Sequence, residues 1–133
     1  MGSETTVSGV IVTDPQFSDE DFETLTRFQF DEKYPFPNMF GPIQRGYLSC
    51  SIPFGRVFKS LVEELDEWEP RFESLLSTLH CRSASVRFAD EIHGDLSLEY
   101  VCVDGWLRDV APRKRSWRKW RNGSEADWVG PVD

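Results

Sequence analysis

Residues 55–80 read GRVFKSLVEELDEWEPRFESLLSTLH, and the rest of the chain can be arranged around them. Apolar side chains recur here every three or four residues, at Val57, Leu61, Leu65, Trp68, Phe72, Leu75 and Leu79. This spacing places them along one face of an α-helix, the pattern of a helix that packs on a core. Charged side chains lie on the opposite face: Lys59, Glu63, Glu64, Asp66, Glu67, Arg71 and Glu73. We therefore predict one long amphipathic helix from Gly55 to His80.

Pro70 lies inside this predicted helix. Proline lacks a backbone N–H and its ring clashes with the preceding turn, so it kinks or breaks a helix. The apolar spacing nevertheless continues past Pro70 in the same phase. We therefore predict two segments that share one buried face. The first ends at about Trp68, and the second begins with Pro70 in its first turn, where proline is tolerated.

Strand patterns flank the predicted helix on both sides. Residues 5–13 are rich in β-branched side chains, and residues 47–53 alternate apolar and polar ones. Residues 83–92 and 96–103 alternate around a turn at 93–95, which predicts a β-hairpin. These patterns predict an α+β fold, in which an about four-stranded, mainly antiparallel sheet is covered on one face by the long helix kinked near Pro70.

Two shorter helices are also predicted. Ser18 can cap a short N-terminal helix that runs to about Phe28, with Asp21 reaching back as in a capping box. Asp104 can cap a second one over Gly105–Val110. We expect a single domain over residues 1–133, with a core at 5–111 and a C-terminal extension at 112–133.

The C-terminal extension contains Asn122-Gly123, a strong signal for a β-hairpin with a two-residue turn. Pairing outward from this turn places Arg118 opposite Asp127 and Trp117 opposite Trp128. We predict a Trp-rich hairpin or ordered tail. A basic, Trp-bearing helix and a disordered tail are the alternatives that the residues leave open.

Charge is distributed unevenly along the chain of 133 residues, whose formal net charge is −8. The balance is −11 over residues 1–112, +6 over 113–121 and −3 over 122–133. An acidic body disfavours general binding to nucleic acid and suits a basic partner. Apolar runs are too short for a membrane span, and the N-terminus is polar and acidic, so we expect a cytoplasmic protein with no membrane partner.

Residues that could perform chemistry are few. The three cysteines, an odd number without close spacing, favour free buried thiols over a disulfide framework or a zinc site. The two histidines, His80 and His93, belong to no recognisable catalytic or zinc-binding motif. We therefore predict no catalytic residue, no metal and no cofactor, and a protein that is not an enzyme.

Three segments together resemble a family of small, uncharacterised bacterial α+β domains, some of which are encoded as immunity proteins beside polymorphic toxins. They are the opening strand and acidic helix at Val7–Phe28, the strand Leu48-Ser49-Cys50-Ser51-Ile52, and the helix with Leu65-Asp66-Glu67-Trp68-Glu69-Pro70 and then Leu75-Leu76. The resemblance covers about residues 7–103, and the basic, Trp-rich tail departs from it. It implies a protein-binding role and carries no catalytic residues.

The expected function is that of a non-catalytic, protein-binding inhibitor, an immunity protein that occludes a basic toxin. Carboxylates off the apolar face of the long helix should face water and steer this partner: Glu63, Glu64, Asp66, Glu67 and Glu73. Residues 31–46 form an unusually apolar loop, and its aromatic side chains supply further candidate contacts: Tyr34, Phe36 and Phe40.

The alternative function is binding to nucleic acid or an anionic surface. Its candidate residues form the basic, Trp-bearing segment near the C-terminus: Arg113, Lys114, Arg115, Trp117, Arg118, Lys119, Trp120 and Arg121. Affinity of this kind should fall steeply with salt.

Overall fold

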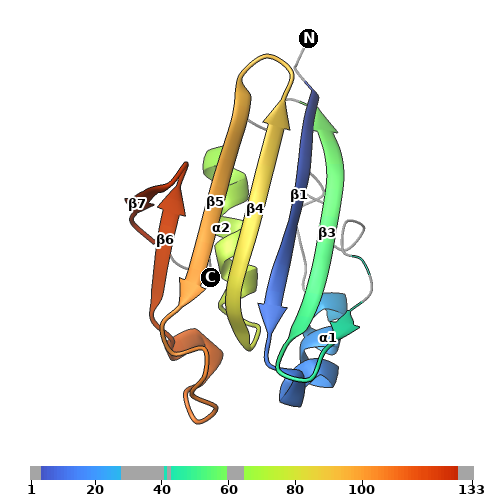
Figure 1. Ribbon diagram of the computed structural model, residues 1–133, viewed down its shortest axis with the longest axis vertical. Coiled ribbons are helices and arrows are strands. Elements are labelled where there is room, and N and C mark those ends of the chain that lie inside the picture. Colours follow the sequence, from blue (N-terminus) through green and yellow to red (C-terminus); the bar gives the residue numbers. More distant parts are fainter. Residues whose placement is uncertain (1–3, 28–40, 42, 60–64, 129–133) are drawn as a thin grey trace.

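The computed structural model describes residues 4–27, 41, 43–59 and 65–128 (Figure 1). Its helices are α1 (Ser18–Arg27) and α2 (Leu65–Leu76), and short 3₁₀ turns lie at η1 (Pro15–Phe17) and η4 (Pro112–Lys114). The strands are β1 (Glu4–Thr13), β2 (Gln44–Arg45), β3 (Cys50–Lys59), β4 (Cys81–Asp90), β5 (Gly94–Cys102), β6 (Trp117–Arg121) and β7 (Ser124–Ala126). The predicted α+β class is therefore confirmed.

The strands form one antiparallel sheet in the order β2-β3-β1-β4-β5-β6-β7. Helix α2 lies against one face of it, and α1 lies at the end where β1 finishes (Figure 1). The sheet is larger than the four strands that we predicted. The C-terminal hairpin extends it beyond β5, and the short β2 extends it beyond β3, so neither is a separate appendage.

The long helix was predicted to begin too early. Residues 55–59 belong to β3, where Gly55 pairs with Ser8 and Val57 with Thr6 of β1. Val57 is 53% exposed, whereas Phe58 packs against the core. Over so few residues a helical and a strand period fit the same apolar positions, so partners elsewhere in the chain decide between them. Residues 60–64 of the predicted helix lie outside the described residues.

Pro70 lies inside α2 and does not divide the described helix into two segments, contrary to our prediction. Since α2 begins at Leu65, Pro70 occupies its second turn. The backbone hydrogen bond that proline removes there is the one to the carbonyl of Asp66, close to the helix end. The apolar face of α2 is buried as predicted at Trp68, Phe72, Leu75 and Leu76, while Leu65 is only half-buried.

The core lies between α2 and the sheet, and aromatic rings occupy its centre. The ring centroid of Phe72 lies 5.0 Å from that of Trp68, 5.6 Å from Phe54 and 5.8 Å from Tyr100. Phe88 on β4 meets Trp68 edge-on at 5.1 Å. The three cysteines are free and buried, as predicted. No helix among the described residues is long and apolar enough to cross a membrane.

The predicted C-terminal hairpin is confirmed, including its register. Asn122 and Gly123 both have positive φ angles, 51° and 85°, as a two-residue turn of type I′ requires. Trp120 pairs with Glu125. The indole rings of Trp117 and Trp128 stack with centroids 5.0 Å apart. Arg118 forms its ion pair with Glu125, at 2.7 Å, instead of with Asp127.

Two local predictions were wrong. Tyr47 and Leu48, expected to open a strand, lie exposed between β2 and β3. Residues 105–110 form successive turns instead of a helix, because Asp104 does not cap them: its carboxylate accepts a hydrogen bond from the backbone N–H of Ser116 at 2.6 Å. Both segments therefore remain as loops, and they lie at the same end of the sheet as α1 (Figure 1).

Candidate protein-binding site

A buried ionic cluster joins α2 to the C-terminal hairpin. Lys119 on β6 donates hydrogen bonds to Glu69 and Glu73 of α2, and its side chain is almost fully buried. The Lys119 Nζ–Glu73 Oε2 distance is 2.5 Å, and the hydroxyl of Tyr100 donates to the same oxygen at 3.0 Å. Arg121 pairs with Glu69, 2.6 Å from Oε2. These contacts fasten the hairpin to the helix.

Glu73 was predicted to face water for a basic partner, and that prediction is wrong. Its side chain is fully buried, and burial raises its pKa although Lys119 acts in the opposite direction. Burial also raises the pKa of Tyr100 far above its ordinary range. The hydrophobic period of α2 could not reveal this, because the β6 strand that covers Glu73 adds a second buried face.

The other predicted acidic and aromatic contacts have different outcomes. Asp66 and Glu67 are exposed in the first turn of α2, as predicted. Two of the predicted helix carboxylates and all three loop aromatics lie outside the described residues: Glu63, Glu64, Tyr34, Phe36 and Phe40.

Much of the basic segment contacts this chain itself. Arg115 is buried and donates to the backbone carbonyls of Val110 and Leu107, at 3.0 and 3.3 Å. Lys119 and Arg121 pair with the α2 carboxylates, and Arg118 pairs with Glu125. The guanidinium of Arg118 also lies 4.9 Å from the ring centroid of Trp120, and Trp117 stacks on Trp128. Arg113 and Lys114, at the start of the segment in η4, are exposed.

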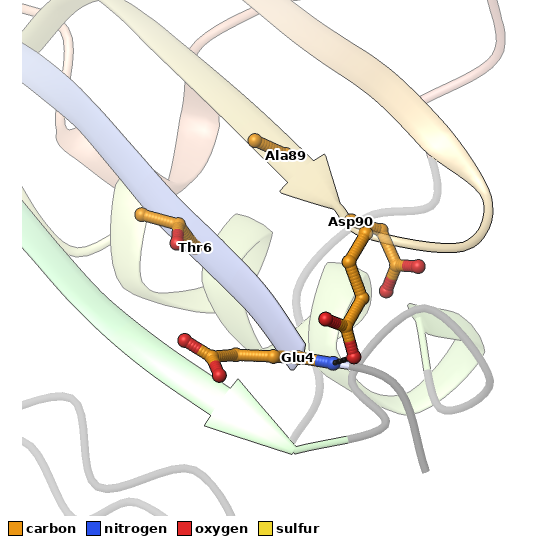
Figure 2. Close-up of a pocket in the computed structure, with 5 residues that line it drawn as sticks. Glu4, Thr6, Ala89 and Asp90 are labelled. Atoms are coloured by element: carbon orange, nitrogen blue, oxygen red, sulfur yellow. Dashed lines mark hydrogen bonds between the residues drawn. The ribbon is translucent and has the colours of Figure 1, made fainter.

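An acidic hollow of about 270 Å³ lies at the end of the sheet where β1 begins, and Figure 2 shows Glu4, Thr6, Ala89 and Asp90 around it. Asp90 is bound within the chain: one carboxylate oxygen accepts from the Thr5 hydroxyl at 2.6 Å, and the other accepts from two backbone N–H groups of the β4–β5 turn. Glu91 accepts from the backbone N–H of Glu4 at 3.0 Å. The carboxylates of Asp90 and Glu91 therefore stabilise the strand ends.

A second hollow, of about 320 Å³, lies at the opposite end of the sheet. We call it the arginine–tryptophan cleft. Four separate segments build it: η1, the β2–β3 loop, the start of β4 and the loop that follows β5. Its lining residues are Pro15, Tyr47, Leu48, Arg82, Trp106 and Arg108.

Arg82 forms the floor of this cleft. Its guanidinium carbon lies 3.7 Å from the ring centroid of Trp106, and it donates a hydrogen bond to the carbonyl of Leu48. Gly105 allows the loop to approach this closely, since a Cβ there would lie 3.0 Å from the Arg82 Cα. A cation held over an indole ring is stabilised by the ring quadrupole, most strongly where water is excluded.

Asp14 links the two arginines of the cleft. Arg108 donates to it with two parallel hydrogen bonds, from Nε at 2.8 Å and from Nη2 at 3.0 Å. Arg82 forms an ion pair with the same carboxylate, with its Nη2 3.4 Å from Oδ2. The pKa of Asp14 lies below its ordinary value, chiefly because Arg108 donates to the carboxylate. The side chain of Asp14 is almost fully buried, so the two arginines are held on a fixed anion.

Asp21 and His80 attach α1 to the sheet beside this cleft. Asp21 accepts from the backbone N–H of His80 at 3.1 Å and lies 2.8 Å from its ring Nδ1, and the imidazole stacks on Phe17 at 3.9 Å. Asp21 therefore does not close the capping box that we predicted. Burial raises its pKa.

Exposed apolar side chains surround the cleft. Tyr47 is 96% exposed and Trp106 is 68% exposed, and Leu48 and Leu107 are more than half exposed beside them. Helix α1 carries carboxylates in its first turn, and one of these, Asp19, binds Arg45 of β2 at 2.8 Å. We call this end of the molecule the aromatic end face, defined by Tyr47, Leu48, Trp106 and Leu107.

Sequence reasoning did not find the aromatic end face. The available signal was a pair of apolar residues directly after a turn glycine, Gly46-Tyr47-Leu48 and Gly105-Trp106-Leu107. We assigned each pair to a regular element whose buried side would account for it. Loops that carry large apolar side chains without a matching strand or helix period are candidate contact sites.

The Asp14–Arg108 pair should make stability depend on pH. A carboxyl group whose pKa is lowered by folding stabilises the protein above its unfolded pKa, and that contribution is lost as the pH falls through the folded value. We expect the difference in unfolding free energy between the wild-type protein and Arg108→Gln to be constant above about pH 5 and to shrink as the pH falls toward about 2. Urea denaturation at several pH values measures this. Arg87→Gln, which alters an exposed arginine of β4, is the control, and a difference for Arg108→Gln that stays constant down to about pH 2 would contradict the assignment.

The described residues contain no cluster of three or more histidine, cysteine or carboxylate side chains that could hold a metal ion. The cleft instead offers two guanidinium groups, an indole and a phenol at one end of the sheet, a set that binds other molecules through stacking and charged hydrogen bonds. Comparison with protein-family models, with curated proteins and with solved structures found no match to this chain.

Proposed function

We propose that this protein binds another protein through the aromatic end face and inhibits it by occlusion, as an immunity protein does with a basic bacterial toxin. One observation supports this above the others: exposed tryptophan, tyrosine and leucine side chains from two distant loops gather around an arginine pair. Tryptophan, tyrosine and arginine dominate the residues on which protein–protein affinity depends. Large apolar side chains that gather at one surface also mark interaction sites.

The end face is organised before any partner arrives. Arg82 is buried, its guanidinium stacks on the indole of Trp106, and it donates a hydrogen bond to the carbonyl of Leu48 in the β2–β3 loop. Asp14 holds Arg108 in a two-point contact. Side chains that are ordered in the free protein lose less conformational entropy on binding, which raises affinity.

The negative charge of the chain and of α1 favours a basic partner. The chain carries a net charge of −8, and the first turn of α1, at the same end of the sheet, holds Asp19, Glu20 and Asp21. Glu20 and Glu23 of α1 are exposed. Exposed carboxylates attract a basic protein over several ångströms and raise its association rate, especially at low salt.

The double substitution Tyr47→Ala/Trp106→Ala tests the proposal. Two exposed aromatic side chains are removed, one of which stacks on Arg82, so the free energy of unfolding should fall by no more than about 2 kcal/mol. Truncation of two central contacts should weaken binding at least about 100-fold. Candidate partners are the proteins encoded beside this chain's own gene. Binding is measured by biolayer interferometry, and protection is measured as growth of cells that express the candidate toxin.

Two matched variants complete the experiment. Val101→Ala removes an exposed apolar side chain from the sheet and should leave binding and protection unchanged. Glu20→Lys/Glu23→Lys reverses charge on α1 and should slow association at least about tenfold at low salt, with less effect at high salt. A double aromatic variant that folds, binds at full affinity and still protects the cells would refute the proposed contact site.

A further inference from the structure

The floor of the arginine–tryptophan cleft contains one buried hydrogen-bond donor without an acceptor in the described part of the chain. Nε of Arg82 is buried and has no partner among the described residues, although the other two nitrogens of this side chain are engaged. Arg108 uses Nε and Nη2 on Asp14, and none of its contacts within the described chain involves Nη1. Buried donors that lack an acceptor are rare and costly, so a cleft that contains one is suited to a ligand that supplies an acceptor.

We infer that this cleft is a carboxylate-binding subsite that takes an acidic group flanked by an apolar side chain from the bound protein. The source of this group, a bound protein, rests on the proposed function. The affinity of the cleft for carboxylates is independent of the proposed function. Two guanidinium groups face one carboxylate, Asp14, which leaves one uncompensated positive charge at the floor. Guanidinium groups bind carboxylates through charged, directional hydrogen bonds.

The walls of the cleft favour an apolar group beside the carboxylate. Pro15, Leu48 and the rings of Tyr47 and Trp106 form the rest of the lining, so an aliphatic group beside the acid would be buried with it. The volume of about 320 Å³ has room for such a unit. A phosphate group, with up to two negative charges, would place its second charge against Asp14 without a second cation to balance it.

The subsite can be tested on the protein alone, by following the Trp106 indole N–H and the arginine Nε–H signals in NMR titrations. N-acetyl-leucine carries a terminal carboxylate, and acetyl-Leu-Glu-amide carries a side-chain carboxylate. Acetyl-Leu-Gln-amide is the uncharged counterpart of the second probe, and inorganic phosphate tests the anion class. For ligands of this size we expect dissociation constants of about 1–10 mM for the two carboxylates and at least tenfold weaker binding of the glutamine peptide and of phosphate.

Variants assign the binding to the cleft. Arg108→Gln, whose folding is checked by its NMR spectrum, should weaken carboxylate binding at least tenfold, and Arg87→Gln on β4 should not change it. Binding of N-acetyl-leucine alone identifies a chain terminus as the source, whereas binding of the glutamate peptide alone identifies a side chain. Equal binding of the glutamate and glutamine peptides, unchanged binding to Arg108→Gln, or tighter binding of phosphate would each overturn the inference. Because these probes need no partner, intact carboxylate binding by a wild-type protein that binds none of the candidate toxins refutes the proposed function and not the subsite.

Discussion

Lys119→Met should lower the free energy of unfolding by about 3–5 kcal/mol, the cost of removing one member of a buried ionic cluster. Lys119 is the cation that Glu73 contacts, and it also contacts Glu69, with all three side chains at or below 6% exposure. Methionine fills a similar volume, so the loss reports the removal of the positive charge beside Glu69 and Glu73 more than a cavity. Urea denaturation measures the change.

Two further variants separate the ionic effect from packing. Lys119→Met/Glu73→Gln should recover most of the stability, because glutamine is neutral and can still accept the hydrogen bond from Tyr100, while Arg121 continues to pair with Glu69. Arg118→Gln breaks an exposed ion pair on the same strand and should cost less than about 1 kcal/mol. Equal losses of unfolding free energy for Lys119→Met and Arg118→Gln would show that the buried cluster contributes no more to stability than an exposed ion pair.

The loss of stability in Lys119→Met should depend on pH because of the ionisation of Glu73. Burial already raises the pKa of Glu73, and loss of Lys119 removes the largest influence that opposes this. A carboxyl group whose pKa is raised by folding binds its proton more readily in the folded state, so acidification stabilises the fold. The deficit of Lys119→Met should therefore shrink as the pH falls.

Phe72→Ala should cost about 3–5 kcal/mol, the range for a large aromatic side chain removed from a core. Phe72 is fully buried and contacts the rings of Phe54, Trp68 and Tyr100, which come from β3, α2 and β5. Truncation therefore opens a cavity between the helix and two strands of the sheet. The change is measured by denaturant unfolding monitored by circular dichroism.

Val57→Ala is the matched control for Phe72→Ala. Both residues belong to the apolar series from which we predicted the long helix, yet Val57 lies on β3 and is half exposed. Its truncation should cost less than about 0.5 kcal/mol. Leu65→Ala should fall between the two, because Leu65 is only half-buried. A large loss at Val57 would support the helix that the sequence predicted there.

Short-range signals in the sequence determined several elements of this protein by themselves. Asn122-Gly123 predicted a hairpin turn, and the structure shows the predicted register, because the positive φ angles of such a turn depend on the two residues themselves. Alternation over residues 83–103 predicted the β4–β5 hairpin, and the helical period predicted the buried face of Trp68, Phe72 and Leu75. In each case the deciding pattern lies within one continuous stretch of the sequence.

Long-range contacts decided the rest. Whether residues 55–59 join a helix or a strand depended on β1, which pairs with them across about fifty residues of chain. Glu73 lies on the charged side of α2 in sequence, and its burial is supported by Lys119, 46 residues away, and by the hydroxyl of Tyr100. The candidate site depends on the same kind of contact, since Asp14 and Arg108 are 94 residues apart. Periodicity reports whether a position has a buried side, but it does not report what covers that side, because the partner comes from a distant segment whose position is set by the assembled sheet.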